Sequence, residues 1–274
     1  MRLDFVVAGV PKAGTTWCWA ALDASPDFFV PSAKDLYYFD RHHARGTDWY
    51  ERHFEKALPG QLRGEVCHDY VYSKAAWTRI DDYSNGECVF VLVLRNPVDR
   101  ALSQLRYSMQ MGHIRSLDLE VALEDDPLIL RNSRYEDFLE PVKKHFGARL
   151  QILIYEDLHA SPDCFMGSLF EACGGQRHSE LPDIPPANVS GQARSPAMMS
   201  VARKGISLAD RMGRRDLIGR LKNSPLRRAF IHQAGSYGPL LDQREALSGE
   251  LSSSVLESSN FLADEYGVVT SWTL

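Results

Sequence analysis

Residues 9–17 read GVPKAGTTW and directly follow the apolar run FVVA at residues 5–8. The run predicts a buried strand, and the glycine-flanked stretch after it predicts a loop that leads into a helix. Such a turn directs backbone N–H groups and the positive end of a helix at one point, which suits a bound phosphate. Gly9 and Gly14 let the backbone approach an anion closely, and Lys12 adds a mobile positive charge. The stretch therefore predicts a phosphate-binding loop.

The position of the lysine distinguishes this loop from that of ordinary ATPases. In a nucleoside-triphosphate P-loop the lysine follows the second glycine directly, and the Ser or Thr behind it holds Mg²⁺. Here Lys12 precedes Gly14 by two residues, and Thr15 and Thr16 follow the glycine. The two threonines add hydroxyl donors for an anion. The motif therefore indicates phosphate binding without the usual Mg²⁺ arrangement.

A second strand–helix junction lies at residues 88–103, which read CVFVLVLRNPVDRALS. Its continuous apolar start is typical of a strand buried on both faces of a parallel sheet, and Pro97 suits the first turn of a helix. Arg95 falls at the carboxyl end of this strand, where open α/β sheets bind ligands. Ser103 lies two helical turns further along the chain. Both junctions thus place polar residues where a ligand is expected.

The two junctions resemble those of the sulfotransferases that use 3′-phosphoadenosine-5′-phosphosulfate (PAPS). The 5′-phosphosulfate loop of that family resembles PKAGTTW, and its 3′-phosphate motif resembles LRNPVDRALS. Two further segments are similar to the family, KDLYYFD at residues 34–40 and YEDL at residues 155–158. All four motifs lie within residues 4–158, and the C-terminal third is only loosely family-like. The chain is most similar to the bacterial type, close to the carbohydrate-sulfotransferase-like branch.

The alternation of strands and helices predicts an α/β protein with a P-loop-like three-layer fold, in which helices flank a central parallel sheet. Strands are expected at Asp4–Ala8, Phe28–Val30, Gly64–Cys67, Cys88–Leu94 and Leu150–Ile154. Helices are expected to begin near Thr15, Asp48, Lys74, Pro97, Ser133 and Pro162, with a last helical region at Leu240–Tyr266. We expect one domain over residues 1–274, with a cofactor-binding core at 1–180 and a loop and helices at 181–274 that complete the acceptor site.

The composition favours a globular enzyme without a metal. The 274 residues are 44% apolar, which suffices for a full core, and the net charge of −5 gives no indication of nucleic-acid binding. The five cysteines form no CxxC pair, and no His/Cys cluster has zinc spacing. With no leader-like segment and no apolar run near the length of a membrane span, these features predict reduced thiols and a cytoplasmic location.

The resemblance implies a role for each motif. Lys12 would be catalytic, because its ammonium group can follow the leaving oxygen as negative charge builds there. Arg95 and Ser103 would bind the 3′-phosphate, the group that separates PAPS from ATP, and an arginine can engage a phosphate with two hydrogen bonds. Trp17 either stacks on the adenine or packs into the core. The implied cofactor-binding residues are Pro11, Lys12, Ala13, Gly14, Thr15, Thr16, Trp17, Arg95 and Ser103.

The general base that removes the acceptor proton has three candidates. The carbohydrate branch has Lys-Glu where this chain has Lys34-Asp35, so the carboxylate is one methylene shorter. The cytosolic branch uses a histidine after a later strand, and His68 follows such a strand here. Glu65 is the third candidate, and Val66 replaces a lysine often found after that glutamate. Asp35 is favoured, with His68 second.

The sequence leaves the acceptor open. It would be a hydroxyl or an amine of a small-molecule or carbohydrate-like compound, and five aromatic residues hint at its site: Tyr37, Tyr38, Phe39, Tyr70 and Tyr72. Residues 194–228 hold ten Lys/Arg and two Asp/Glu, a local charge of +8. This stretch either closes over cofactor phosphates, docks an acidic acceptor or carrier protein, or is a solvated helix surface. Within it, Arg203-Lys204-Gly205 weakly resembles a 3′-phosphate motif.

The sequence thus favours sulfuryl transfer from PAPS, with PAP as the product and no metal requirement. A P-loop small-molecule kinase or another nucleotide-binding protein is the alternative, and it requires a magnesium-holding Ser/Thr directly after a loop lysine. A PAP-binding module without catalysis is a third reading, which the presence of Lys12 disfavours.

Overall fold

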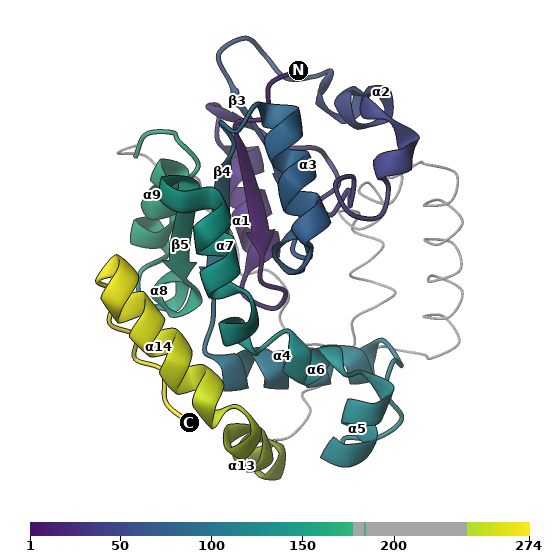
Figure 1. Ribbon diagram of the computed structural model, residues 1–274, viewed down its shortest axis with the longest axis vertical. Coiled ribbons are helices and arrows are strands. Elements are labelled where there is room, and N and C mark those ends of the chain that lie inside the picture. Colours follow the sequence, from purple (N-terminus) through teal and green to yellow (C-terminus); the bar gives the residue numbers. More distant parts are fainter. Residues whose placement is uncertain (178–183, 185–239) are drawn as a thin grey trace. The chain divides into compact units, whose positions relative to one another are not determined.

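The computed structural model describes residues 1–177, 184 and 240–274 (Figure 1). The chain divides into two compact units, Met1–Arg95 with Phe138–Ala187 and Asn96–Asp137 with Asn188–Leu274. The core expected at residues 1–180 therefore contains a segment, Asn96–Asp137, that groups with the second unit. The basic stretch 194–228, the loop before it and the Arg203-Lys204-Gly205 motif lie outside the described residues.

The first unit is built on a five-stranded sheet in the order β2-β3-β1-β4-β5, and every pair of neighbours is parallel. The strands are β1 (Phe5–Gly9), β2 (Phe28–Phe29), β3 (Leu62–Val66), β4 (Val89–Leu94) and β5 (Leu150–Ile154). This arrangement confirms the predicted P-loop-like α/β fold with its central parallel sheet. β1 and β4 were predictable because each is a short apolar run that the fold buries on both faces, whereas β3 reads LRGEV and contains Arg63 and Glu65.

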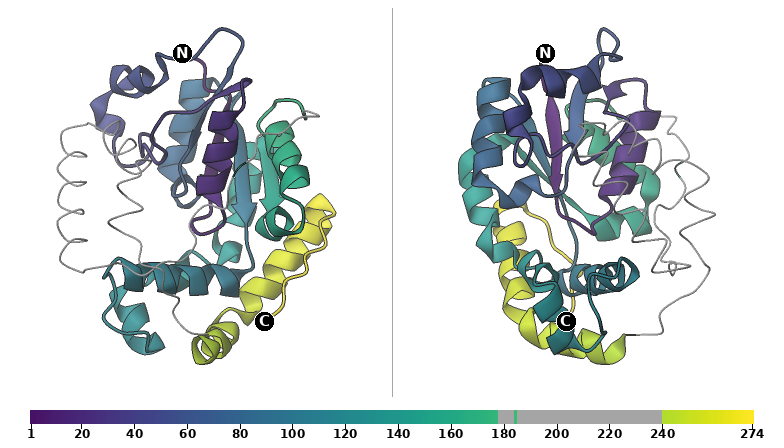
Figure 2. Two further views of the ribbon diagram at one scale, coloured as in Figure 1. Left: turned by 180° about the vertical axis from the view of Figure 1, so that it is seen from behind. Right: turned by 90° about the vertical axis from the view of Figure 1, so that its right-hand side faces the viewer.

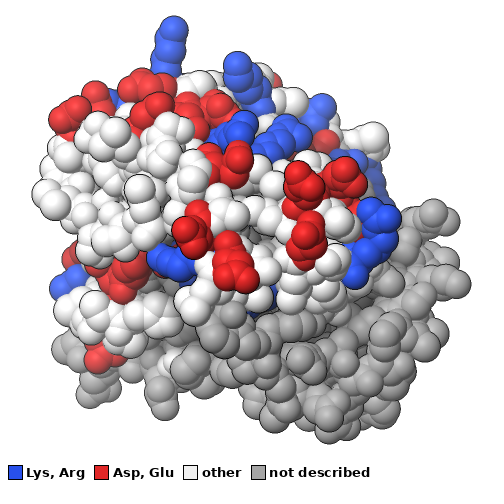
Figure 3. All heavy atoms as spheres, turned by 90° about the horizontal axis from the view of Figure 1, so that it is seen from below, with Lys and Arg blue, Asp and Glu red and all other residues white. Residues whose placement is uncertain are grey.

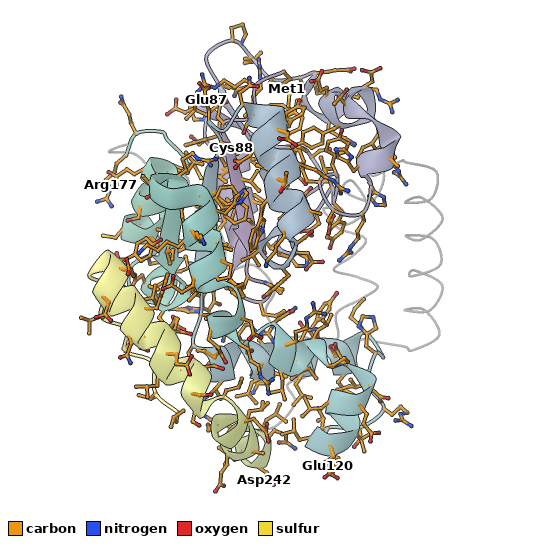
Figure 4. The ribbon with its side chains drawn as sticks, in the orientation of Figure 1. Met1, Glu87, Cys88, Glu120, Arg177 and Asp242 are labelled. Atoms are coloured by element: carbon orange, nitrogen blue, oxygen red, sulfur yellow. The ribbon has the colours of Figure 1, made fainter. Side chains whose placement is uncertain are left out.

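β1 is the central strand, and residues Phe5–Ala8 are completely buried. The chain first adds β3 on one side of β1 and later adds β4 on its other side. The strand order therefore reverses at β1, and the crevice beyond the carboxyl ends of such neighbouring strands is where open α/β sheets bind ligands. The loop at residues 9–17 leaves β1 at this crevice. Met1 and Glu87, labelled in Figure 4, lie at the opposite, amino end of the sheet.

Helices cover both faces of the sheet. α3 (Lys74–Ser84) and α7 (Leu139–Phe146) lie on the face toward the viewer in Figure 1, and the Phe146 ring of α7 stacks on Phe90 of β4 at 4.0 Å between centroids. α1 (Thr15–Ala24) and α9 (Pro162–Ala172) cover the other face, as the view from behind in Figure 2 shows. The short α2 (Thr47–Glu51) and α8 (Tyr155–Ala160) complete the α-helices of the described part of this unit.

The second unit is helical in its described part. It contains α4 (Pro97–Gln110), α5 (Leu119–Asp125), α6 (Leu128–Arg131), α13 (Leu241–Glu250) and α14 (Ser252–Tyr266). Arg100 of α4 is completely buried and donates to the carbonyls of Leu128 and Ile129. Asp99, also on α4, pairs with Arg244 of α13. The single helical region expected at 240–266 is thus two helices that meet at Leu251.

The helix expected near Ser133 begins later, at Leu139. The serine hydroxyl does not cap a helix, because it accepts a hydrogen bond from Arg100 Nε at 2.6 Å and lies 3.3 Å from the carbonyl oxygen of Ile129. The hydrogen bond with Arg100, which is distant in the sequence, replaces the helix cap that we expected at Ser133. Among the described residues, none of the helices combines the length and the apolar character needed to span a bilayer.

Candidate functional site

The loop between β1 and α1 has the tight geometry that its sequence predicts. Lys12 and Gly14 both adopt left-handed backbone conformations, with φ of 73° and 80°. A Cβ atom on Gly14 would lie 2.9 Å from the Tyr155 ring, so this position requires glycine. α1 begins at Thr15 without a side-chain cap. The first N–H groups of this helix therefore lie at the loop, where an anion can accept from them.

The residues after Gly14 differ in exposure. Thr15 is buried and Thr16 is half-buried. The Trp17 side chain is 5% exposed and meets the Phe165 ring of α9 edge-on, with 5.7 Å between centroids. Trp17 was expected either to stack on the adenine or to pack into the core. This contact favours the second interpretation, because the indole packs between α1 and α9.

Arg95 lies at the carboxyl end of β4 and reaches the phosphate-binding loop. Its Nη1 donates to the carbonyl of Lys12 at 3.0 Å, and its guanidinium carbon lies 4.6 Å from the centre of the Tyr155 ring. The Tyr155 hydroxyl lies 3.0 Å from His159 Nε2. The structure thus places Arg95 beside the loop, as the two sequence motifs together predict. Ser103 is half-buried on α4, in the second unit, so its role beside Arg95 stays a prediction.

Tyr155 is a site residue that sequence reasoning did not assign. Its ring contacts the Arg95 guanidinium on one side and fills the space beside Gly14. Such cation–π contacts contribute about 0.5–2 kcal/mol, according to how far the charge is desolvated. The signal available in the sequence was the YEDL segment directly after the last strand, which places Tyr155 at the same end of the sheet as the loop.

Asp35 and His68 form one hydrogen-bonded pair. His68 Nδ1 lies 2.7 Å from Asp35 Oδ1, and the Lys34 ammonium lies 2.8 Å from Asp35 Oδ2 and 3.4 Å from His68 Nδ1. His68 Nε2 faces Asp69 Oδ1 at 3.3 Å, and Asp69 pairs with Arg41. The two residues that the sequence offered as alternative bases are therefore in direct contact. Lys34 supplies the positive charge beside this pair. Position 66, where the resemblance implies a lysine, holds Val66 in this chain.

The Asp35–His68 pair lies next to the phosphate-binding loop. β1 pairs with β3, and His68 follows β3 by two residues. A Cβ atom on Gly9, the first residue of the loop, would lie 3.3 Å from the His68 carbonyl oxygen. The side chain of His68 is 23% exposed and that of Asp35 is 7% exposed, so His68 is the more accessible member. The loop and the pair share one edge of the sheet.

Glu65, the third candidate base, is completely buried at the end of β3. Its Oε1 accepts hydrogen bonds from the Leu36 N–H and the Tyr70 hydroxyl, both at 3.1 Å. Burial raises the pKa of Glu65 to about 8, although the hydrogen bonds lower it. This carboxyl has no access to an acceptor hydroxyl. Tyr38, Phe39 and Tyr70 are likewise buried, which leaves Tyr37 and Tyr72 as the more exposed aromatic residues of the expected five.

The raised pKa of Glu65 predicts how stability depends on pH. Folded Glu65 keeps its proton up to about pH 8, whereas an ordinary glutamate loses it near 4.5. The folded state therefore holds one more proton between these values, so the free energy of unfolding should fall as pH rises, by up to about 1.4 kcal/mol per pH unit. Glu65→Gln should remove this slope. Chemical denaturation at several pH values checks it, and equal slopes for both proteins would contradict the prediction.

On the face drawn in Figure 3, acidic and basic side chains lie interspersed. Among residues 1–177, 184 and 240–274, no group of three or more His, Cys, Asp or Glu side chains has a geometry suited to a metal ion.

Comparisons with known proteins identify the family of the chain. The sulfotransferase domain family matches residues 2–185. The membrane-associated sulfotransferase kil1 of Dictyostelium discoideum is 34% identical over 126 residues, which cover 44% of this chain and 26% of that protein. The human heparan sulfate glucosamine 3-O-sulfotransferase 3B1 is 32% identical over 98 residues, 36% of this chain and 25% of that protein. The matched segments thus span about a quarter of these curated relatives.

Solved structures share the fold. The crystal structure of a sulfotransferase from Alicyclobacillus acidocaldarius superposes with a TM-score of 0.60 at 20% identity, covering 80% of this chain and 96% of that one. The sulfotransferase domain of the Synechococcus PCC 7002 olefin synthase gives 0.50 at 16% identity, covering 74% and 87%. Fold, loop and family match agree on the class of protein. The chain belongs to the sulfotransferase domain family.

Proposed function

We propose that this protein transfers a sulfuryl group from PAPS to a hydroxyl or amine of a small-molecule or carbohydrate-like acceptor. One observation carries the proposal. Arg95 donates to the carbonyl of Lys12, which brings the predicted 3′-phosphate ligand and the predicted catalytic lysine together at the end of β1 and β4. An arginine at this place supports a cofactor with a second phosphate, because its planar group can bind phosphate oxygens bidentately.

The phosphate-binding loop would hold the 5′-phosphosulfate. The N–H groups at the start of α1 point to the loop, and a helix N-terminus stabilises an anion by about 0.3–2 kcal/mol. Lys12 would place its ammonium on the oxygen that bridges phosphorus and sulfur. As the bond between this oxygen and sulfur breaks, the oxygen gains negative charge, which the lysine stabilises. PAP leaves with that electron pair.

The Asp35–His68 pair would take the proton of the acceptor. The acceptor oxygen or nitrogen attacks sulfur in line with the leaving oxygen and forms the new bond, and its proton passes to the pair. His68 is the more exposed partner and would contact the acceptor once the acceptor displaces Asp69 Oδ1 from His68 Nε2, while Asp35 holds the imidazole at Nδ1. This division of roles replaces a choice between two independent bases. Glu65 takes no part in proton removal.

An acceptor screen tests the proposal. The protein is incubated with PAPS and a panel of hydroxyl- and amine-bearing compounds, including oligosaccharides, and the products are analysed for a sulfate adduct by mass spectrometry. We expect an adduct that forms equally well in excess EDTA, because the loop has no lysine directly before a Ser or Thr. Phosphorylation of the acceptor by Mg-ATP, with no transfer from PAPS, would instead identify a kinase.

Arg95→Ala should weaken the binding of 3′,5′-ADP far more than that of 5′-AMP. Charge-assisted hydrogen bonds to a phosphate contribute about 1.5–3 kcal/mol, which corresponds to a loss of roughly 10- to 100-fold for the nucleotide that carries the 3′-phosphate. Isothermal titration calorimetry measures both constants. Arg52→Ala, an exposed arginine of the same unit, is the control. Equal losses for the two nucleotides would show that Arg95 does not contact the 3′-phosphate.

A further inference from the structure

The segment that carries Asp35 has an unfavourable backbone. Asp35 and Tyr37 are non-glycine residues with positive φ, 62° and 54°. Residues in this region cost about 1–3 kcal/mol each and persist only where their surroundings impose the conformation. Both positions lie within KDLYYFD, beside the Asp35–His68 pair. Specific contacts must therefore hold this segment in place.

Three backbone N–H groups of the segment are bound to the end of β3 and the turn after it. The Asp35 N–H donates to the Val66 carbonyl at 2.8 Å, and the Leu36 N–H donates to Glu65 Oε1 at 3.1 Å. The Phe39 N–H donates to the Tyr70 hydroxyl at 3.2 Å, and that hydroxyl donates to the same Glu65 oxygen at 3.1 Å. One carboxyl oxygen thus fixes two N–H groups, one directly and one through a phenol.

We propose that Glu65 and Tyr70 form a clamp that sets the position of Asp35 against His68. The proposal rests on the proposed function, since it gives the clamp a purpose in proton removal from the acceptor. Glu65 and Tyr70 are positioning residues: both are completely buried and act through the segment that they hold. A shift of about 1 Å in such a pair can cost on the order of 100-fold in rate.

The chemistry of the clamp predicts which replacements it tolerates. Glu65 uses one oxygen as an acceptor, and a glutamine amide oxygen can accept the same two hydrogen bonds. The Glu65 carboxyl also shares a side-chain hydrogen bond with the hydroxyl of Tyr50, which is completely buried like Glu65 itself. The amide NH₂ of a glutamine would supply a donor on this side. Methionine has a similar shape and no comparable acceptor, so it would leave the Leu36 N–H buried and unpaired.

Kinetics and a spectroscopic signature test the clamp. Tyr70→Phe and Glu65→Met should each lower kcat about 10- to 100-fold, with an unchanged KM for PAPS, because the hydrogen bonds that they delete hold the segment of Asp35. Glu65→Gln should retain kcat within about threefold of the wild type, since it keeps the acceptor oxygen. Tyr83→Phe is the matched control, because it deletes a phenol that bonds Glu51 in the same aromatic cluster.

The ¹⁵N signal of His68 Nδ1, recorded at a single pH, reports the hydrogen bond to Asp35 without any turnover. It should move in Tyr70→Phe and Glu65→Met and stay in Glu65→Gln and Tyr83→Phe. If the protein transfers no sulfuryl group, this signal still decides on the clamp. An unmoved signal and an unchanged kcat in Tyr70→Phe would overturn the proposal. Equal kcat values and equal Nδ1 signals in Glu65→Gln and Glu65→Met would also overturn it. This comparison can be made even if Tyr70→Phe does not fold.

Discussion

Lys12→Ala should nearly abolish sulfuryl transfer, with a loss in kcat of at least about 100-fold, while the protein stays folded. Lys12 carries the positive charge of the loop sequence GVPKAGTTW. This charge is needed most in the transition state, when negative charge develops on the leaving oxygen. Alanine keeps the Cβ atom, so the strain of the positive φ at this position is the same in both proteins. The substitution therefore removes the charge and leaves the loop geometry.

The measurement is kcat with a saturating acceptor, together with the melting temperature. Lys56→Ala, which removes an exposed lysine of the same unit, should behave as the wild type in both. Lys12→Ala should keep the melting temperature, because its ammonium group is not part of the buried core. A turnover within tenfold of the wild type would mean that Lys12 does not stabilise the leaving group.

The second large effect is expected at the Asp35–His68 pair. Asp35→Asn and His68→Gln should each lower kcat by about 10²–10⁴-fold, the usual contribution of a general base. Because the two side chains share a 2.7 Å hydrogen bond, we expect them to act as one unit. The double variant should then be no worse than the more damaging single variant, whereas independent groups would give multiplied losses.

A double-mutant cycle in kcat measures this coupling. Asp82→Asn makes the same chemical change at an exposed position of α3 and serves as the control. A single variant that retains more than about a tenth of wild-type kcat would remove that residue from the proposed base. Multiplied losses in the double variant would show that Asp35 and His68 act separately.

The sheet could be predicted from the sequence because its signals are local. Most strands are apolar runs followed by a loop or a helix start, β3 with Arg63 and Glu65 being the exception, and the expected bounds agree with the structure to within two residues. The phosphate-binding loop was equally local, since its glycines and its lysine lie within nine residues. Ser133 shows the limit of such reasoning, because its hydroxyl contacts Arg100 rather than capping a helix.

The composition of the Asp35–His68 pair could not be predicted, because it depends on contacts between distant segments. Thirty-three residues separate the two side chains. Their contact requires the left-handed turn at Asp35 and the attachment of this turn to Glu65 and Val66. The sequence could name both residues but could offer them only as alternatives. The role of Tyr155 could not be predicted for the same reason, since its contacts with Arg95 and Gly14 join three segments of the chain.

Thermal unfolding with added nucleotide tests whether the loop and Arg95 bind a nucleotide with a 3′-phosphate. A ligand that binds only the folded state raises the free energy of unfolding by RT ln(1 + [L]/Kd) and with it the melting temperature, and the test does not require a known acceptor. We expect a clear rise in melting temperature with 3′,5′-ADP, with or without EDTA, and little or none with Mg-ATP at the same concentration. Stabilisation by Mg-ATP but not by 3′,5′-ADP would contradict it.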